Sequence, residues 1–385
     1  MPAWWINTFR RVTSSGRYIP EVDGLRLLAI AGVFFYHLRG YVNAKSKTVW
    51  AAPVEDDWLG RLTHHGNIGV PLFFVLSGFI LGLPFASHDL KGKEPVSLRG
   101  YFLRRLTRLE PPYLLSLTVF LIMLRLVNHI PWKVLIPGYI SSALYLHSIL
   151  GDETDTIQSV GWSLEIEVQF YLLAPLLAKL FAIRDVKVRR GVIIGSVVLT
   201  VVLQRLLIEP GSVLSDTLLN YLQYFLGGFF ITDLFLNGVM TPRSIMDQHV
   251  WDIVWIGGWL AVLASLARPG LSLLTLPLLF PLIMAATFRA GWCRKLLSLP
   301  MVTAIGGMCY SIYLVHFQLI SLLGRITKDL PFSNVFWQNL LIQGIVIGLP
   351  VLLLSSFFFI LVEKPCMNKN WPQELYRRVA ALAGR

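Results

Sequence analysis

Charged side chains are scarce in this sequence of 385 residues. Asp, Glu, Lys and Arg together make up 15% of it, whereas hydrophobic residues make up 55%. Average soluble domains carry about 25% charged residues. The mean hydropathy of +0.62 shows the same bias. These values exclude an ordinary soluble domain and predict a polytopic membrane protein.

Cysteine is also scarce, and no cluster of cysteines has a metal-binding spacing. Cys293, Cys309 and Cys366 fall in a predicted inner loop, a predicted span and the predicted inner tail. Because none is expected on the oxidising side of a membrane, we predict neither a disulfide framework nor a metal site. Internal repeats and low-complexity tracts are absent as well. The sequence also lacks a cleavable signal peptide, so the first apolar run should act as an uncleaved anchor.

Long apolar runs dominate the chain. A run of about 17–25 apolar residues is long enough to cross the hydrocarbon core of a bilayer. We find such runs at 23–40, 68–87, 112–128, 161–181, 190–208, 216–237, 250–267, 271–288, 302–323 and 336–362. The apolar stretch 134–150 is interrupted by Pro137, Gly138 and His147, and we interpret it as a re-entrant or interfacial segment. The expected fold is an all-α bundle of about ten transmembrane helices.

The net charge of +12 is distributed unevenly over the predicted loops. With the N-terminus inside, 22 of the 34 Lys and Arg residues fall in the inner segments 1–22, 88–111, 182–190, 238–249, 289–300 and 363–385. The outer loops 41–67, 129–160, 209–215, 268–270 and 324–335 hold 7. Since Lys and Arg are enriched in cytoplasmic loops, we predict that both termini are cytoplasmic. The excess charge then reports topology rather than binding of nucleic acid.

This topology describes a single membrane domain over residues 1–385. Residues 1–22 form a cytoplasmic lead-in, residues 363–385 form a cytoplasmic tail, and no extra soluble domain is expected.

Two ionisable side chains, Arg26 and His37, interrupt the first apolar run. An ionisable residue at membrane depth costs roughly 2.5–3.5 kcal/mol on insertion scales, so it usually faces a protein interior or a wet cavity. Eleven residues of helix turn through about 1100° and rise about 16 Å. Arg26 and His37 are therefore predicted to share one face of one helix, like two points along a path across the membrane.

A basic cluster, Arg104, Arg105 and Arg108, precedes the prolines 111 and 112. On a helix, residues three and four positions apart are neighbours, so these guanidinium groups lie close together. Arginine forks bind phosphate oxygens in pairs, which suits a multiply charged anion. The alternative is an ordinary positive-inside anchor that contacts the phosphates of membrane lipids.

Polar side chains also open the second span. Asn67 is expected at its outer mouth, where it would shape a loop over a cavity. Ser77 and Gly78 lie in its middle, and we interpret them as packing residues because small residues let helices approach closely.

The fourth span opens with Glu165, Glu167 and Gln169 at alternate positions. On a helix, Glu165 and Gln169 share one face and Glu167 points elsewhere, so at least one carboxylate is expected to point into the bundle. Two roles are open for these acids. They are either counter-ions to the arginines within the spans or groups that act on the substrate.

The ninth span carries Tyr310, Tyr313 and His316 as one polar stripe within an apolar helix. A lone intramembrane histidine is more often a hydrogen-bonded structural residue than a catalyst.

Six segments of the chain, in this order, resemble the membrane acyltransferase 3 family, whose bacterial members O-acylate sugars of surface polysaccharides and related molecules. They are Asp23 to Arg26 with ten residues before His37, Gly66 to Phe79, Phe102 to Tyr113, Trp162 to Tyr171, Tyr310 to His316 and Val362 to Pro365. The resemblance covers nearly the whole chain and indicates the form that consists of the membrane domain alone.

The resemblance implies roles for individual residues. His37 matches the essential histidine and Arg26 its partner in the same motif, while Arg105 and Arg108 match the arginine pair that meets acyl-CoA. Where the family commonly has two adjacent acids, this chain has Glu167 followed by Val168, so Glu167 is the catalytic candidate and Glu165 occupies a variable position. Arg104, beside this pair, is a third candidate for binding acyl-CoA. Further candidates for the substrate site or its structural support are Asp23, Asn67, Trp162, Ser163, Gln169, Tyr310, Tyr313 and His316.

The implied activity is O-acyl transfer, with acetyl as the default group, from cytoplasmic acyl-CoA to a hydroxyl of a surface glycan or glycolipid sugar. The implied location is the bacterial cytoplasmic membrane. His37 would act as a general base or as an acyl carrier, and both versions are open. Glu167 would orient the imidazole or stabilise its charge, and Arg26 would neutralise negative charge that develops near the thioester.

Two other classes of function are weighed against acyl transfer. A proton-coupled transporter or exporter of a glycan or small molecule would also use intramembrane Arg, His and Glu, but it usually shows two-fold internal repeats, which this sequence lacks. A structural partner in a glycan-synthesis complex would tolerate substitution of His37. A homo-oligomer is compatible with each of these functions.

Overall fold

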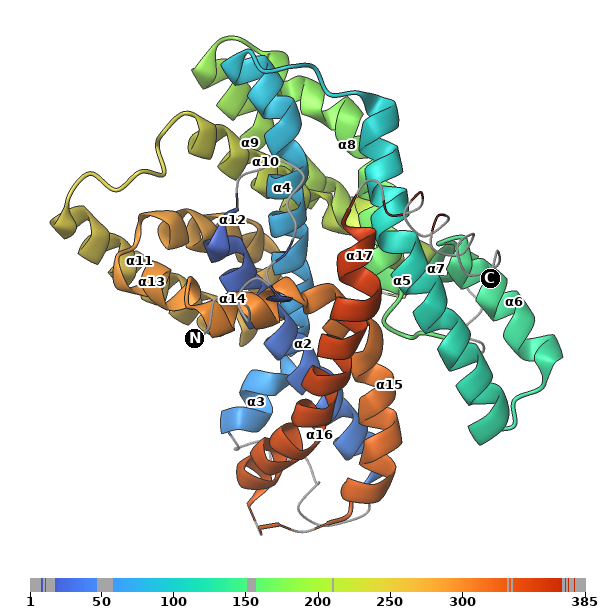
Figure 1. Ribbon diagram of the computed structural model, residues 1–385. Helices are drawn as coiled ribbons and strands as arrows, with labels where there is room; N and C mark the ends of the chain where they lie inside the picture. Colours follow the sequence, from blue (N-terminus) through green and yellow to red (C-terminus); the bar gives the residue numbers. More distant parts are fainter. Residues whose placement is uncertain are drawn as a thin grey trace.

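The computed structural model describes residues 8–9, 11, 18–46, 58–150, 157–209, 211–330, 332–333, 335–368, 371, 373 and 377. Within these residues the regular secondary structure is helical and contains no strand (Figure 1). The all-α prediction is therefore confirmed. Most of the predicted lead-in 1–22 and of the predicted tail 363–385 lies outside the described residues.

Seven helical segments are long and apolar enough to cross a membrane. They are Pro20–Lys45, Trp58–Lys91, Leu98–Val127, Ile245–Leu266, Gly270–Arg289, Cys309–Thr327 and Phe336–Cys366. Each overlaps one of the predicted spans. The other three predicted spans coincide with α8 (Trp162–Leu177), α9 (Val186–Leu207) and α10 (Leu218–Leu236), which do not meet the same criteria of length and hydropathy. Membrane crossing by these three helices stays a prediction, as does a total of about ten.

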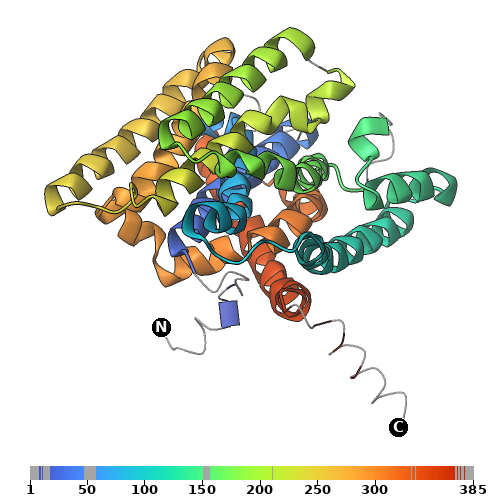
Figure 2. The same cartoon turned by 90° about the horizontal axis from the view of Figure 1, so that it is seen from above.

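Helix α2 (Pro20–Lys45) lies at the centre of the molecule. It contacts α4 (Gly69–Lys91), α14 (Pro300–Gly307), α15 (Cys309–Thr327) and α16 (Phe336–Phe358). In both ribbon views α5 (Leu98–Val127) and α6 (Trp132–Ala143) lie to one side, and α11 (Ile245–Leu266) and α12 (Pro269–Arg289) lie to the other (Figures 1 and 2). A short helix, α3 (Trp58–His64), and a 3-10 turn, η2 (Gly66–Ile68), lead into α4.

Helices α4 and α10 cross at two glycines. A Cβ atom on Gly78 would overlap the backbone of Phe225, and one on Gly228 would overlap the backbone of Val75. Close crossings of this kind need small residues. The packing role predicted for Gly78 is therefore confirmed.

Helix α5 (Leu98–Val127) runs without a break through Pro111 and Pro112. The predicted inner segment 88–111 is therefore helical at both ends, in α4 up to Lys91 and in α5 from Leu98, and its location on the inner side stays a prediction. Prolines are tolerated inside such helices when neighbouring helices and local adjustments satisfy the freed backbone groups. As a result, the arginine cluster lies within about the first three turns of α5.

The predicted re-entrant stretch 134–150 forms two short helices, α6 (Trp132–Ala143) and α7 (His147–Leu150). Their re-entry into the membrane stays a prediction.

The predicted span 302–323 is divided in two. Helix α14 ends at Gly307, and α15 begins at Cys309 after a break at Met308. A Cβ atom on Gly306 would overlap the carbonyl group of Asp23, so α14 packs directly on the start of α2. The close approach and the break are tertiary features that hydropathy does not reveal.

The described residues contain further short elements. They are the 3-10 turns η3 (Ala178–Ala182) and η4 (Val213–Asp216), the short helix α13 (Trp292–Leu297) and two turns that follow α16. That last helix, α16, continues through a π-helical turn, η5 (Phe359–Glu363), into α17 (Lys364–Cys366). Single π-helical turns occur frequently at functional sites.

Candidate active site

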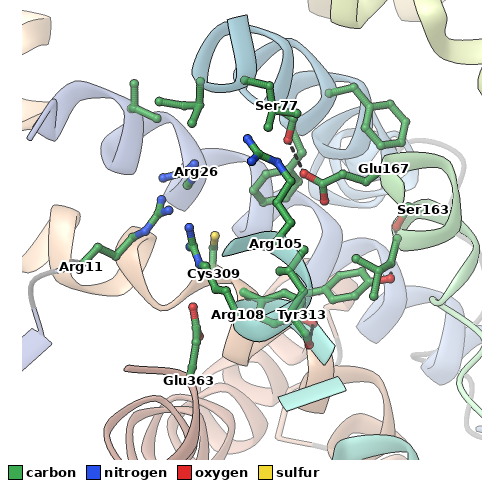
Figure 3. A pocket seen from close by; sticks show the side chains of 18 of the residues that line it. Arg11, Arg26, Ser77, Arg105, Arg108, Ser163, Glu167, Cys309, Tyr313 and Glu363 are labelled. Carbon is green, nitrogen blue, oxygen red and sulfur yellow. Dashed lines mark hydrogen bonds between the residues drawn. The ribbon is translucent and has the colours of Figure 1, made fainter. Parts of the chain in front are cut away.

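A cavity of about 880 Å³ lies between α2, α4, α5, α8, α15 and η5 (Figure 3). It is lined by five arginines, three carboxylates and His37. The predicted site residues on its wall are Asp23, Arg26, His37, Asn67, Arg104, Arg105, Arg108, Trp162, Ser163, Glu167, Tyr310 and Tyr313. The fold therefore brings together residues that lie almost three hundred positions apart in the sequence.

Arg26 is held at the cavity by a carboxylate of its own helix. Its Nη1 donates to Asp23 Oδ1 at 2.6 Å, and Arg11 Nη1 lies 3.4 Å from the same oxygen. Asp23 is buried, so its charge is balanced by these two arginines rather than by solvent. The Asp23 carboxylate thereby fixes Arg26 and Arg11 on one side of the cavity.

Arg105 is held against the ring of Tyr101. Its guanidinium carbon lies 3.6 Å from the centroid of the Tyr101 ring, and its Nη1 donates to the Tyr101 carbonyl at 3.0 Å. The Tyr101 hydroxyl donates in turn to the carbonyl of Tyr171 at 3.1 Å. A cation over an aromatic face is stabilised electrostatically. Tyr101 therefore orients Arg105 toward the cavity.

Arg108, Arg11 and Glu363 form the next part of the wall. Figure 3 shows the Glu363 carboxylate pointing toward the two arginines. Its Oε2 accepts from the Ser311 backbone N–H at 3.1 Å and from the Ser311 hydroxyl at 2.5 Å. Its Oε1 and Arg108 Nε are buried without a hydrogen-bond partner among the described residues. Buried polar atoms in this state mark a place where a polar ligand can bind.

The charges on the wall favour an anion. The arginines are Arg11, Arg26, Arg104, Arg105 and Arg108, and the carboxylates are Asp23, Glu167 and Glu363. Arginine forks suit phosphate oxygens, and electrostatic attraction is strengthened where water is excluded.

Glu167 lines the cavity, and its Oε1 accepts from the Ser77 hydroxyl at 2.5 Å, the contact drawn in Figure 3. Glu165 and Gln169 lie outside the cavity. Glu165 Oε2 accepts from the Ser148 backbone N–H at 2.9 Å, and Gln169 Oε1 accepts from the Leu218 backbone N–H at 2.8 Å. The predicted separation of faces is therefore present, and Gln169 joins α8 to the start of α10.

The structure does not favour the counter-ion role for these acids. Among the described residues, neither Glu165 nor Glu167 forms an ion pair with an arginine. Arg205 donates instead to the carbonyl of Gly270 at 2.5 Å.

His37 lines the part of the cavity that lies about 16 Å along α2 from Arg26. Its ring centroid is 5.3 Å from that of His316 and 5.1 Å from that of Phe317. No hydrogen bond between His37 and Glu167 occurs in the described part of the chain. Orientation or charge stabilisation of the imidazole by Glu167 stays a prediction, and the ring contacts of the imidazole come from α15.

His316 is buried beside His37 and does not line the cavity. Its Nδ1 lies 2.9 Å from the carbonyl oxygen of Tyr313 and 3.1 Å from that of Ile312. Because both neighbours are acceptors, Nδ1 carries the proton and Nε2 is an acceptor. Nε2 has no partner among the described residues.

Three residues of the cavity wall are not among the predicted site residues. Arg11 belongs to the predicted lead-in, Ser77 is predicted to be a packing residue, and Glu363 lies in a segment that contributes only to the family resemblance. A glutamate at the end of an apolar run is itself a signal of function. No such signal marks Ser77, whose role depends on the position of Glu167.

The described residues contain no group of three or more His, Cys, Asp and Glu side chains that is placed to hold a metal ion.

Comparison with known proteins decides the family. The profile described as "Acyltransferase domain" matches residues 19–361. This chain belongs to the acyltransferase 3 family. Every cavity residue named above except Arg11 and Glu363 falls within the matched range.

Several curated proteins are similar to the chain. Peptidoglycan O-acetyltransferase OatA of Listeria monocytogenes is 27% identical over 346 residues, which cover 81% of this chain and 51% of the relative. O-acetyltransferase OatA of Staphylococcus aureus is 26% identical, with 80% of this chain and 51% of the relative covered. The chain thus spans about half the length of these relatives. No solved structure matches it.

Proposed function

We propose that this acyltransferase 3 protein moves an acetyl group from acetyl-CoA to a hydroxyl of a bacterial glycan. The observation that carries the proposal is the single cavity that holds both the arginine cluster and His37. The names of the relatives, which are O-acetyltransferases, support acetyl as the group and a glycan as the acceptor.

The donor suits the arginine end of the cavity. Coenzyme A carries several phosphates, and Arg105 and Arg108 face the cavity from neighbouring positions on α5. Arg26 lies across from them on α2, about 16 Å along the helix from His37, where it would bind the donor phosphates together with Arg105 and Arg108 and so hold the thioester near His37. On the predicted topology this end faces the cytoplasm, where acyl-CoA is made.

The acceptor hydroxyl would meet the thioester near His37. As a general base, His37 takes the hydroxyl proton while the oxygen attacks the thioester carbonyl carbon. The new C–O bond forms, the C–S bond breaks, and the proton passes from the imidazolium to the CoA thiolate. A covalent acyl-histidine would give the same products in two steps. We favour direct base catalysis because it needs a single transfer at the end of the cavity.

The proposal is tested with purified protein in nanodiscs, acetyl-CoA labelled with ¹⁴C in the acetyl group, and envelope glycans from the producing cells. Because one relative is named for peptidoglycan, peptidoglycan is the first glycan to assay. We expect His37→Ala to reduce transfer by about 100-fold or more at unchanged abundance. Mass spectrometry of the product identifies the acylated hydroxyl.

The donor site is tested with the double variant Arg105→Ala/Arg108→Ala, which should raise the KM for acetyl-CoA by about tenfold or more. Arg99→Ala is the matched control, because Arg99 is exposed on the same helix and does not line the cavity. Full transfer by the His37→Ala protein would refute this mechanism. An unchanged KM in the double variant would refute this donor site.

A further inference from the structure

A second cavity, of about 480 Å³, lies at the end of α2 that is remote from Arg26. Its wall comes from the ends of α2, α5 and α15, and it includes Tyr41, Lys45, Asn128, Gln318 and Arg325. Lys45 is nineteen residues beyond Arg26 on α2, which is a rise of about 28 Å. We call this cavity the outer pocket, since these helix ends are predicted to face outward.

The charged side chains that line the outer pocket are all basic. They are Lys45, Arg325 and Lys328, and no carboxylate among the described residues lines it. Asp329, next to the pocket, neutralises Lys328 through an ion pair. Arg325 Nη2 donates to Asn128 Oδ1 at 2.9 Å, an acceptor without charge. Lys45 and Arg325 therefore leave the pocket with a positive excess that suits an anionic group.

Gln318 supplies a second and independent sign of a ligand. Its side chain lines the outer pocket although the residue is only 7% exposed. Neither its Nε2 nor its Oε1 has a hydrogen-bond partner among the described residues. Leaving a buried polar group unpaired costs about 1–3 kcal/mol. A ligand with hydroxyl groups would satisfy both atoms, because a hydroxyl both donates and accepts.

Phe317 connects the outer pocket to the candidate catalytic residue. Its side chain lines the pocket, and its ring centroid lies 5.1 Å from that of His37. His37 lines the arginine cavity. One aromatic side chain therefore separates the outer pocket from the residue that would activate the acceptor, and this position favours the acceptor itself over a lipid headgroup.

We propose that the outer pocket binds an acidic saccharide, the acceptor of the transfer reaction. Its carboxylate or phosphate contacts Lys45 and Arg325, and a hydroxyl contacts Gln318. The inference rests on the proposed function, which it deepens by naming the class of acceptor.

The first test measures binding without transfer. Envelope glycans of the producing cells are divided by anion exchange into an acidic and a neutral fraction, and each is titrated onto the immobilised protein in phosphatidylcholine nanodiscs. We expect the acidic fraction to bind more tightly than the neutral one. The variants Lys45→Ala/Arg325→Ala and Gln318→Leu should each weaken that binding by about tenfold. Equal binding of both fractions, or unchanged binding by both variants, would overturn the proposal.

The second test measures transfer. The same variants should raise the half-saturating concentration of acidic glycan by about tenfold while the KM for acetyl-CoA changes less than about twofold. Lys91→Ala is the control, because Lys91 is exposed and lies outside both cavities. If the unaltered protein binds the acidic fraction but transfers no acetyl group, the proposed function fails while the pocket stands. If it transfers only to neutral glycans, the pocket proposal fails while the function stands.

The third test measures the binding of anionic lipid. Native mass spectrometry of nanodiscs that contain phosphatidylglycerol shows whether the double variant loses bound anionic lipid. Loss of lipid with unchanged glycan binding would assign the pocket to a headgroup and overturn the proposal. Retained lipid with weakened glycan binding would support it.

Discussion

His37 on α2 and His316 on α15 lie side by side, with ring centroids 5.3 Å apart and ring planes inclined by 50°. The His316 ring is fixed because its Nδ1 donates to backbone carbonyls one turn earlier on α15. His37 therefore packs on a ring that cannot rotate freely. Residues of α15 therefore restrict the space that the imidazole of His37 can occupy.

Replacing His316 should slow transfer without weakening donor binding. We expect His316→Ala to lower kcat by about tenfold with little change in the KM for acetyl-CoA, because small displacements of a catalytic group are costly. His316→Phe retains an aromatic ring against His37, so it should recover most of the activity. If His316→Ala and His316→Phe lower kcat equally, His316 does not act by packing against His37.

Tyr101 should control the affinity for the donor through Arg105. In Tyr101→Leu the guanidinium loses the ring beneath it, and we expect the KM for acetyl-CoA to rise by about fivefold, in line with a cation–π contribution of about 1 kcal/mol. Tyr101→Phe keeps the ring and should stay close to the unaltered protein. Steady-state kinetics on both variants provide the comparison. A larger effect for Phe than for Leu would assign the role to the hydroxyl.

The two neighbouring acids of α8 should respond differently to loss of charge. Glu167 faces the cavity, so Glu167→Gln is expected to lower transfer by about tenfold or more at normal abundance. Glu165 bonds to the backbone of α7 outside the cavity, so Glu165→Gln should retain most of the activity. The assay is acetyl transfer at saturating donor. Full activity of Glu167→Gln would remove this residue from the mechanism.

Arg26 should matter for turnover as well. Arg26→Ala removes positive charge from the donor end of the cavity, and we predict a fall in kcat of about tenfold or more, because the thioester is then held less precisely near His37. Arg268→Ala is a suitable control, because Arg268 is exposed and lies outside both cavities. Single-turnover measurements separate this effect from product release. Unchanged kcat in the Arg26→Ala protein would contradict the assignment.

Asp233 should be essential for stability rather than activity. It is fully buried and accepts from Arg189 Nε and Arg190 Nε, each at 2.6 Å. Asp233→Ala leaves the buried Arg189 without its partner, which should destabilise the protein by about 3–5 kcal/mol. The midpoint of thermal unfolding in detergent should fall sharply, whereas Asp89→Ala, an exposed acid, should leave it unchanged. An unaltered midpoint in Asp233→Ala would show that Arg189 finds another partner.

Much of the fold is determined by the sequence alone. Hydropathy is a local property, so seven predicted spans overlap apolar helices of sufficient length. An ionisable residue in such a run must be buried in protein or reach a wet cavity. The sequence alone therefore indicates that Arg26, His37 and Glu167 are candidates for a functional site. The family resemblance added Arg105 and Arg108, because its motifs are also contiguous in sequence.

The tertiary structure decided which of these residues meet. Ser77 faces Glu167 because α4 packs against α8, and Gln169 faces α10 instead of the cavity. The extension of α5 through its prolines and the break at Met308 likewise depend on neighbouring helices.

The partners of His37 show the same division. Its presence in an apolar helix could be recognised from ten residues on either side. Its contacts with His316 and Phe317 come from a helix more than 270 positions away, and they exist only because α15 packs on α2. Residue type and local hydropathy specify which side chains must avoid lipid, whereas long-range packing specifies what they face.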